Sequence, residues 1–185
     1  MNRLFVLLSA LLTCGMLSAQ EARQLAHRKI HIMHSRVESH QKEKDNLSYT
    51  TVRYDRKGRE SAVFEFNADS VCIQAEFFEY NKNGKLTLHT TVDSLTHSRS
   101  RLEQRYDKRN LLQEKTLLVD GKQKERTVYT YNTLDDRTCE QVYDESNTLK
   151  KETRFIYDFR GMLLRKTTTD SNGKVIYDKI NHYEY

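Results

Sequence analysis

The chain has 185 residues, with 31 lysines and arginines against 26 aspartates and glutamates and a formal net charge of +5. The two signs are interspersed along the sequence, whereas nucleic-acid binders more often gather their basic residues into a patch, so we expect no nucleic-acid partner. Tryptophan and proline are absent, tyrosine occurs 11 times and glycine 6 times. These counts are typical of strands joined by short turns.

The first residues have the pattern of a secretory signal peptide. A basic start at Arg3 is followed by an apolar run from Leu4 to Leu12, and Ala19 offers a small residue for cleavage. The apolar run is too short to cross about 30 Å of hydrocarbon. We therefore expect residues 1–19 to be removed and the protein to be exported to the periplasm or the exterior, without being an integral membrane protein. Cys14 leaves a lipid anchor open as an alternative, although Thr13 fits poorly before such a cysteine.

Residues 20–48 fit either a strand or a short helix. A strand over residues 28–37 is slightly favoured, but four apolar residues would also allow a helix that covers one face of a sheet: Leu25, Ala26, Met33 and Val37. The same segment holds a group of histidines: His27, His31, His34 and His40. On a helix the first three would share a face and could bind zinc, but no cysteine or carboxylate completes the set. We expect no metal.

From Tyr54 onward the sequence repeats with a period of about 26 residues. The repeated tyrosines are separated by 26, 26, 25, 26 and 26 residues: Tyr54, Tyr80, Tyr106, Tyr131, Tyr157 and Tyr183. A second set of turn residues lies half a period after each of the first five tyrosines, so each unit comprises two strands of roughly nine residues and two tight turns. The sequence thus predicts an all-β fold over residues 49–185. We expect an antiparallel β-meander of about five two-strand units that forms one long twisted, curved sheet.

The turn residues follow one pattern. The first position carries Asp or Asn, whose side chain can accept from the backbone two residues on. The fourth carries Gly, which adopts the left-handed conformation that closes a three-residue hairpin loop. Four stretches match in full: Asp55 to Gly58, Asn81 to Gly84, Asp158 to Gly161 and Asp170 to Gly173. Asn110 and Asn147 replace the glycine elsewhere.

These turns predict the register of the strands that flank them. Tyr80 should lie opposite Leu86, and Tyr106 and Tyr157 should likewise face Leu112 and Leu163. Every second residue from a tyrosine should share its face. This tyrosine face would hold Val52, Phe64, Phe66, Phe78, Leu86, Leu88, Leu102, Leu118, Tyr129, Tyr143, Phe155, Leu163, Val175 and Tyr177. The opposite face would hold Arg53, Glu65, Glu79, Lys85, Arg101, Glu103, Lys115, Arg126, Arg154 and Lys166, with Val63, Ile73, Phe77, Leu117, Val128, Ile156 and Leu164.

The motif Tyr-Asp/Asn-x-x-Gly-x-Leu, with a second Asp-x-x-Gly half a unit later, resembles the YD repeats of Rhs-type bacterial surface proteins. It is also similar to small exported Bacteroidetes proteins of uncharacterised function. The resemblance covers about residues 49–185 and implies a β-sheet that spirals and curves, in some relatives as a shell around a toxin. The chain departs from the motif after Tyr131, where Asn132 to Asp135 lacks the glycine.

Two cysteines remain after signal removal, and both are predicted on the tyrosine face. Cys72 and Cys139 lie about five strands apart, which is roughly 24 Å in an open sheet, whereas a disulfide needs Cα atoms within about 7 Å. We expect two buried, reduced cysteines, because cysteine behaves as a small apolar residue in cores. A bridge would require closure of the sheet.

The sequence shows no catalytic set or cofactor loop. Serines and aspartates are concentrated in turns, and glycines occur singly rather than in phosphate-binding patterns. We expect no enzyme activity and no cofactor. The expected function is an exported scaffold that binds an unknown protein or glycan, and the alternative is a structural or immunity-like protein that masks a partner by sheet-edge pairing. The repeated tyrosines are first packing residues and second candidate binding residues: Tyr54, Tyr80, Tyr106, Tyr131 and Tyr157.

Overall fold

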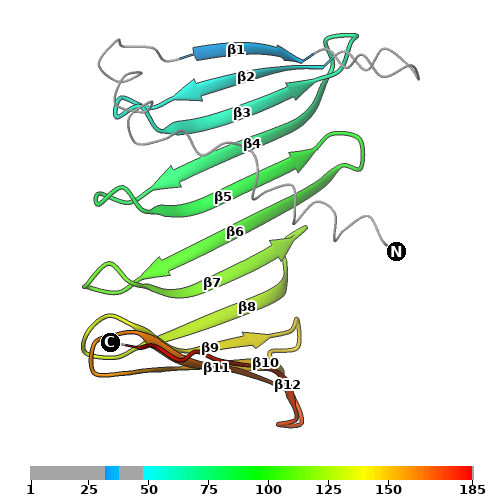
Figure 1. Cartoon of the computed structure of the whole chain (residues 1–185). Helices are drawn as coiled ribbons and strands as arrows, with labels where there is room; N and C mark the ends of the chain where they lie inside the picture. Colours follow the sequence, from blue (N-terminus) through cyan, green and yellow to red (C-terminus); the bar gives the residue numbers. More distant parts are fainter. Residues whose placement is uncertain (1–31, 38–47, 185) are drawn as a thin grey trace. The chain divides into compact units, whose positions relative to one another are not determined.

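The computed structural model describes residues 32–37 and 48–184. The predicted signal peptide, Cys14 and the remainder of the segment 20–48 lie outside the described residues. Every regular element among these residues is a β-strand (Figure 1). The chain divides into two units, residues 1–71 and 72–185. The described part contains no helix with the length and apolarity that a membrane crossing needs.

The first unit contains three antiparallel strands in chain order: β1 (Ile32–Val37), β2 (Ser48–Tyr54) and β3 (Glu60–Phe66). β1 lies in the segment for which the sequence allowed either a strand or a helix. β2 ends at the first of the repeated tyrosines, and Asp55 to Gly58 turns the chain into β3.

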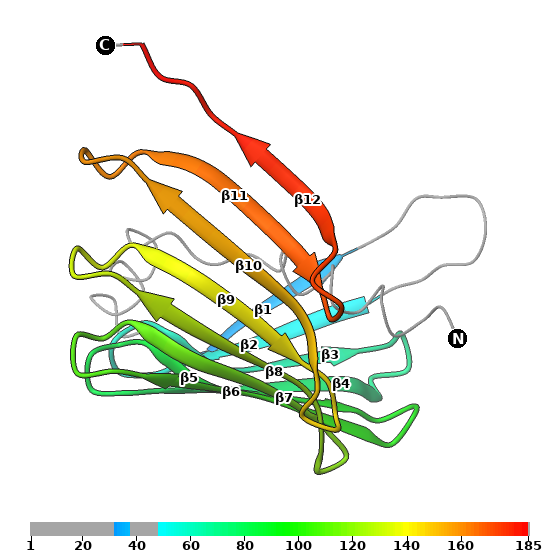
Figure 2. The same cartoon turned by 90° about the horizontal axis from the view of Figure 1, so that it is seen from below.

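The second unit is one antiparallel meander of nine strands. They are β4 (Cys72–Tyr80), β5 (Leu86–Asp93), β6 (Ser98–Tyr106), β7 (Leu112–Val119), β8 (Lys122–Tyr131), β9 (Arg137–Tyr143), β10 (Leu149–Tyr157), β11 (Leu163–Asp170) and β12 (Val175–Ile180). Each strand pairs with its neighbours in the chain, and β4 does not pair with β12, so the sheet is open. It is twisted and curved (Figures 1 and 2). The predicted all-β meander is confirmed.

The turns have the predicted chemistry. Gly84 and Gly161 adopt φ values of 81° and 77°, and Asn110 and Asn147 adopt 69° and 62° at the equivalent positions. Where the motif lacks glycine, Asp135 takes the left-handed conformation with φ 69°. The first residue of each tyrosine turn accepts from the backbone N–H two residues on: Asp55, Asn81, Asp107, Asn132 and Asp158. The predicted pairs of Tyr80, Tyr106 and Tyr157 with leucines are also confirmed.

A β-bulge follows every tyrosine turn, and the sequence analysis did not predict it. Tyr80 lies opposite Leu86, but Glu79 lies opposite Leu88, so Thr87 is an extra residue. The same shift recurs beside the other four repeated tyrosines that precede a turn, and the extra residues are Ser61, Gln113, Thr138 and Leu164. A bulge places two residues opposite one, so it reverses the alternation in the strand that follows.

The bulges correct the predicted faces, because residues that pair directly across strands share a face. Six residues expected on the tyrosine face lie on the opposite face: Phe64, Phe66, Leu88, Leu118, Tyr143 and Val175. Five residues expected on the opposite face lie on the tyrosine face: Val63, Glu65, Lys115, Leu117 and Lys166. All of them except Val175 belong to a strand that directly follows a tyrosine turn. Val175 follows a similar shift at Thr168 and Thr169.

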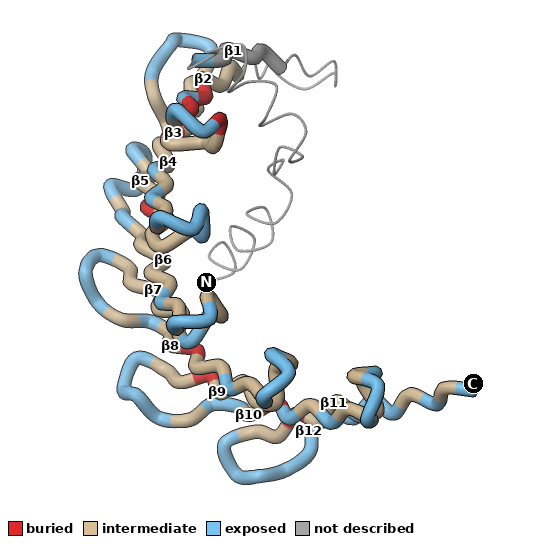
Figure 3. Tube along the Cα trace, turned by 90° about the vertical axis from the view of Figure 1, so that its left-hand side faces the viewer, coloured by how far each residue is buried: buried red, intermediate tan, exposed pale blue. Residues whose placement is uncertain are grey.

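Few side chains are buried. The buried hydrophobic residues among those described are Val52, Tyr54, Ala62 and Val142, and four threonines are buried with them: Thr90, Thr127, Thr153 and Thr168. They occur singly or in small groups along each unit, between intermediate and exposed residues (Figure 3). In the second unit a sheet of nine strands therefore leaves both of its faces largely accessible.

The two cysteines are free, and both are half-buried rather than buried as expected. Cys72 shares the tyrosine face with Tyr80, since both belong to β4 and are an even number of residues apart. Cys139 pairs with Thr130 and lies on the opposite face, because the bulge at Thr138 shifts β9 by one residue. Burial raises the pKa of the Cys139 thiol.

Candidate functional site

Four repeated tyrosines of the second unit make one hydrogen bond in common: Tyr106, Tyr131, Tyr157 and Tyr183. Tyr106 donates its hydroxyl to the carbonyl oxygen of Leu86 at 2.9 Å, and Tyr131 donates to Leu112 at 2.9 Å. Leu86 and Leu112 are themselves the residues opposite Tyr80 and Tyr106. Each hydroxyl thus joins its strand to the start of the strand that leaves the preceding tyrosine turn.

The bulge explains why this carbonyl receives a side-chain donor. A bulge interrupts the ladder of backbone hydrogen bonds, and half-buried carbonyl groups need another partner. Threonine and serine hydroxyls make the complementary bond: Thr87 donates to the carbonyl of Glu79, and Thr138 to that of Thr130. The repeated tyrosine and the bulge therefore belong to one structural motif, in which side-chain hydroxyls bond to the carbonyl groups beside the bulge.

Three of the predicted binding tyrosines are held by these contacts: Tyr106, Tyr131 and Tyr157. Tyr54 belongs to the first unit and is only 5 % exposed. Tyr80, Tyr106, Tyr131 and Tyr157 are half-buried on one face of the second unit. Burial raises the pKa of the Tyr106 and Tyr157 hydroxyls. Any ligand would contact the rings of these tyrosines, because the hydroxyls of Tyr106, Tyr131 and Tyr157 are engaged by the backbone.

Further aromatic rings lie two residues before three of the tyrosines, on the same face: Phe78, Tyr129 and Phe155. The Arg137 guanidinium lies 4.6 Å from the centroid of the Tyr129 ring. The Lys166 ammonium lies 5.6 Å from the ring centroids of both Phe155 and Tyr177. Sequence reasoning assigned these aromatic residues to the tyrosine face but not to a site. It missed both cations, and it placed Lys166 on the wrong face.

A histidine and a glutamate lie side by side on the same face at the start of the second unit. The imidazole Nε2 of His89 lies 2.7 Å from the Glu76 carboxylate, with both side chains about nine-tenths buried. Phe78 stacks on His89 with ring centroids 4.6 Å apart, and the Gln74 amide donates to Glu76 at 2.9 Å. These contacts give both side chains of the pair their interaction partners within the sheet.

The opposite face of the second unit is dominated by arginine and carboxylates. Its arginines are Arg99, Arg101, Arg105, Arg126, Arg154 and Arg165. Most of them pair with an acid on the same face, as Arg126 does with Glu114 at 3.2 Å and Arg165 with Asp178 at 2.8 Å. Ion pairs with this much exposure contribute little to stability and are typical of a solvated surface.

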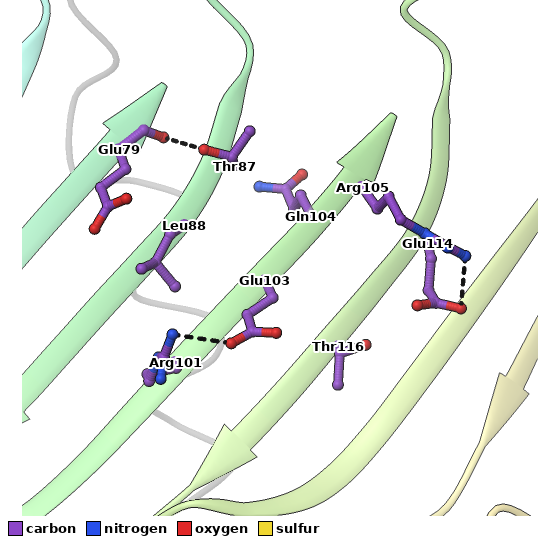
Figure 4. A pocket seen from close by; sticks show the side chains of 9 residues that line it. All are labelled: Glu79, Thr87, Leu88, Arg101, Glu103, Gln104, Arg105, Glu114 and Thr116. Carbon is purple, nitrogen blue, oxygen red and sulfur yellow. Dashed lines mark hydrogen bonds and ion pairs between the residues drawn. The ribbon is translucent and has the colours of Figure 1, made fainter. Parts of the chain in front are cut away.

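A shallow depression of about 340 Å³ lies over β4 to β7 (Figure 4). Nine residues line it: Glu79, Thr87, Leu88, Arg101, Glu103, Gln104, Arg105, Glu114 and Thr116. Two of its arginines are neutralised within it, Arg101 by Glu103 at 3.0 Å and Arg105 by Glu114 at 3.4 Å. The lining contains no cysteine, serine, histidine or lysine, so it offers solvated ion pairs rather than a nucleophile with its base.

Within residues 32–37 and 48–184, no three His, Cys, Asp or Glu side chains are grouped to hold a metal ion. Of the N-terminal histidines, the structure describes only the backbone of His34, in β1. His27, His31 and His40 lie outside the described residues.

No protein-family model and no curated protein matches the sequence. Solved structures do match the chain, and three of them illustrate how distant the likeness is. A TcdB2-TccC3-Cdc42 structure is 11 % identical, with a TM-score of 0.47 over 73 % of this chain and 9 % of the other. A porin-like protein from Bacteroides uniformis is 12 % identical, with a TM-score of 0.38 over 76 % and 56 %. A Bacteroides fragilis protein of unknown function is 13 % identical, with a TM-score of 0.22 over 84 % and 96 %. At these values none of the likenesses assigns a function.

Proposed function

We propose that the protein is an exported, non-enzymatic scaffold whose tyrosine face binds a glycan outside the cytoplasm. The observation that supports this proposal is the unequal division of side chains between the two faces of the second unit. Phe78, Tyr129 and Phe155 share one face with the repeated tyrosines, while the other face carries the ion-paired arginines, with Phe77 and Tyr143 among them. The N-terminal sequence pattern supports export.

The chemistry of the tyrosine face favours a sugar. A sugar ring has an apolar C–H side that can stack on an aromatic ring, and hydroxyls that need polar partners nearby. Around Phe155 both are present: Lys166 lies opposite it and Thr168 and Tyr177 pair in the next row. Tyr177 is 47 % exposed and extends the aromatic surface to β12. A protein ligand is the other outcome of the test below.

An array of glycans probed with the purified protein tests the proposal. Phe155 and Ile156 are neighbours in β10 but lie on opposite faces, so they form a matched pair of positions. We expect Phe155→Ser to weaken glycan binding at least tenfold, which corresponds to about 1.4 kcal/mol, and Ile156→Ser to leave it unchanged. Circular dichroism of both variants checks that the strands are retained. Equal loss in both variants, or no glycan bound by the unmodified protein, would contradict the proposal.

A second function, the masking of another exported protein by edge pairing, has one observation in its favour. All six residues of β12 are exposed, and the strand has a partner on one side only among the described residues. An open edge of this kind accepts an added strand. Retention of a defined exported protein on an immobilised sample, together with silence on the glycan array, would favour this alternative.

A further inference from the structure

β12 is an edge strand with four apolar or aromatic residues out of six, together with Asp178 and Lys179. Among residues 72–184 it pairs with β11 alone, and Figure 2 shows it at the outer side of the second unit. Its large exposed side chains are Val175, Ile176, Tyr177 and Ile180, each between 47 % and 57 % exposed. Natural edge strands are usually protected by charges, proline or a covering segment, and a long apolar edge is a template for another strand.

β12 is also shorter than the strands that occupy the same place in the other repeats. β2, β4, β6, β8 and β10 all extend to the tyrosine of their repeat, whereas β12 stops at Ile180, three residues before Tyr183. Yet the Tyr183 hydroxyl still donates to the carbonyl of Leu163 at 3.0 Å, as its counterparts do. In β10 the stretch up to Tyr157 is paired on its far side by β11. β12 has no such partner among the described residues.

The direction of the free backbone groups follows from one hydrogen bond. The Asn181 N–H donates to the carbonyl of Leu164 in β11 at 2.9 Å. Because successive N–H groups in a strand point to opposite sides, the N–H of Ile180 points away from β11. Ile180 therefore offers a backbone donor at the open edge.

The strand type that fits this edge is also present at the edge of the first unit, as β1. Two kinds of strand alternate along the chain: strands that end at a repeated tyrosine, and strands that follow a tyrosine turn. β1 has the position of a strand that follows a tyrosine turn. His34 pairs with Thr51, three residues before Tyr54, as Leu88 pairs with Glu103, three residues before Tyr106. Ile32 thus occupies the register position of Leu86. It is 53 % exposed, and β1 pairs only with β2 among the described residues.

We propose that copies of this chain associate head to tail, with the open edge of β12 in one copy pairing antiparallel with the open edge of β1 in the next. The contact repeats the pairing of β10 with β11, so Tyr183 lies opposite Ile32 of the partner copy, as Tyr157 lies opposite Leu163. The contact joins two different edges, so it leaves one of each free and continues into an open-ended assembly. This inference is independent of the glycan proposal, because it uses the edges rather than the tyrosine face.

Two variants that each block one edge test the proposal by sedimentation of the purified protein over a series of concentrations. Ile180→Pro removes the outward N–H without removing a hydrogen bond to β11. Proline is tolerated at such outward-facing positions of edge strands. Ile180→Val retains that N–H and is its matched control. Ile32→Asp replaces the exposed apolar side chain with a carboxylate, which would have to pack beside the Tyr183 ring of the partner copy.

The unmodified protein and Ile180→Val should show an average mass that rises past two copies without a plateau. Ile180→Pro and Ile32→Asp should each remain monomeric. An equimolar mixture of these two variants should give a dimer and nothing larger, since each has the one edge that the other lacks. If Ile180→Pro loses strand signal in circular dichroism, Ile176→Lys blocks the same edge with a charge. A monomeric wild type, a wild type that stops at a dimer, or a mixture that stays monomeric would overturn the proposal.

Discussion

The hydroxyl of Tyr157 donates a hydrogen bond of 2.8 Å to the carbonyl oxygen of Arg137. Arg137 is the residue opposite Tyr131, the preceding tyrosine of the repeat. The same hydrogen bond therefore recurs with the 26-residue period of the sequence. In each case a tyrosine donates it to the strand that follows the previous tyrosine turn. This relationship explains why the tyrosines recur whether or not a ligand contacts them.

Removal of that hydroxyl should destabilise the sheet. Tyr157→Phe leaves the Arg137 carbonyl without its side-chain donor, at a cost of about 1 kcal/mol in the free energy of unfolding. Urea denaturation followed by circular dichroism measures the loss. Tyr177→Phe, whose side chain is 47 % exposed, is the control and should change stability by less than about 0.5 kcal/mol. Equal effects at the two positions would show that the bond contributes nothing.

The left-handed turn residue should tolerate asparagine better than alanine. A Cβ added at Gly161 meets no atom within 4 Å, so the cost of Gly161→Ala comes from its φ of +77° alone. We expect Gly161→Ala to lower the free energy of unfolding by about 1 kcal/mol. Gly161→Asn should lower it less, since Asn110 and Asn147 hold the same conformation in other turns. A larger loss for asparagine than for alanine in urea denaturation would be inconsistent with this explanation.

The turn aspartates predict a loss of stability in acid. The backbone N–H of Leu111 holds the pKa of Asp107 below its ordinary value of 3.8, and the N–H of Thr96 does the same for Asp93. A lowered folded pKa contributes stability that is present above the unfolded pKa and is lost as pH falls through the folded value. Urea midpoints should therefore fall below about pH 4. Asp107→Asn keeps the acceptor oxygen, so it should flatten this fall, and an unchanged pH profile would contradict the assignment.

The tyrosines predict a second loss of stability in alkali. Burial raises the pKa of Tyr106, Tyr129 and Tyr157 above 10.0. A raised folded pKa contributes stability that is complete below the unfolded value and is lost as pH rises through the folded one. In an absorbance titration of tyrosine ionisation, some tyrosines should ionise only at a pH above their ordinary pKa, at the same time as the protein unfolds. A single step for all 11 tyrosines at the ordinary pKa would rule this out.

The turns and the strand pairs were predictable because their signals are local. Asp55 with Gly58 and Asn81 with Gly84 specify a loop conformation through side-chain acceptors and left-handed φ values, and the loop fixes the first pair of the hairpin. The strand that ends at each tyrosine was also assigned to the correct face, as for Phe78 and Phe155.

The bulges were not predictable from the same signals, because an extra residue one step beyond the turn leaves the turn chemistry unchanged. The one trace in the sequence is a hydroxyl residue seven positions after three of the tyrosines: Ser61, Thr87 and Thr138. Lys166 was placed on the wrong face for this reason, since it follows the extra residue Leu164. Arg137 lies directly opposite Tyr131, before the bulge, so the turn alone would have placed it on the tyrosine face.

The separation of an aromatic face from an arginine face depends on the bulges, and one cross-linking measurement tests them directly. Gln104 lies opposite Lys115 across the bulged pair of β6 and β7, whereas an unbulged register would place it opposite Glu114. In a variant with Cys72 and Cys139 replaced by serine, a short bifunctional thiol reagent should link cysteines at 104 and 115 rapidly. Cysteines at 104 and 114 should link slowly, because they lie on opposite faces. Rapid linkage of 104 with 114 and not with 115 would contradict the account.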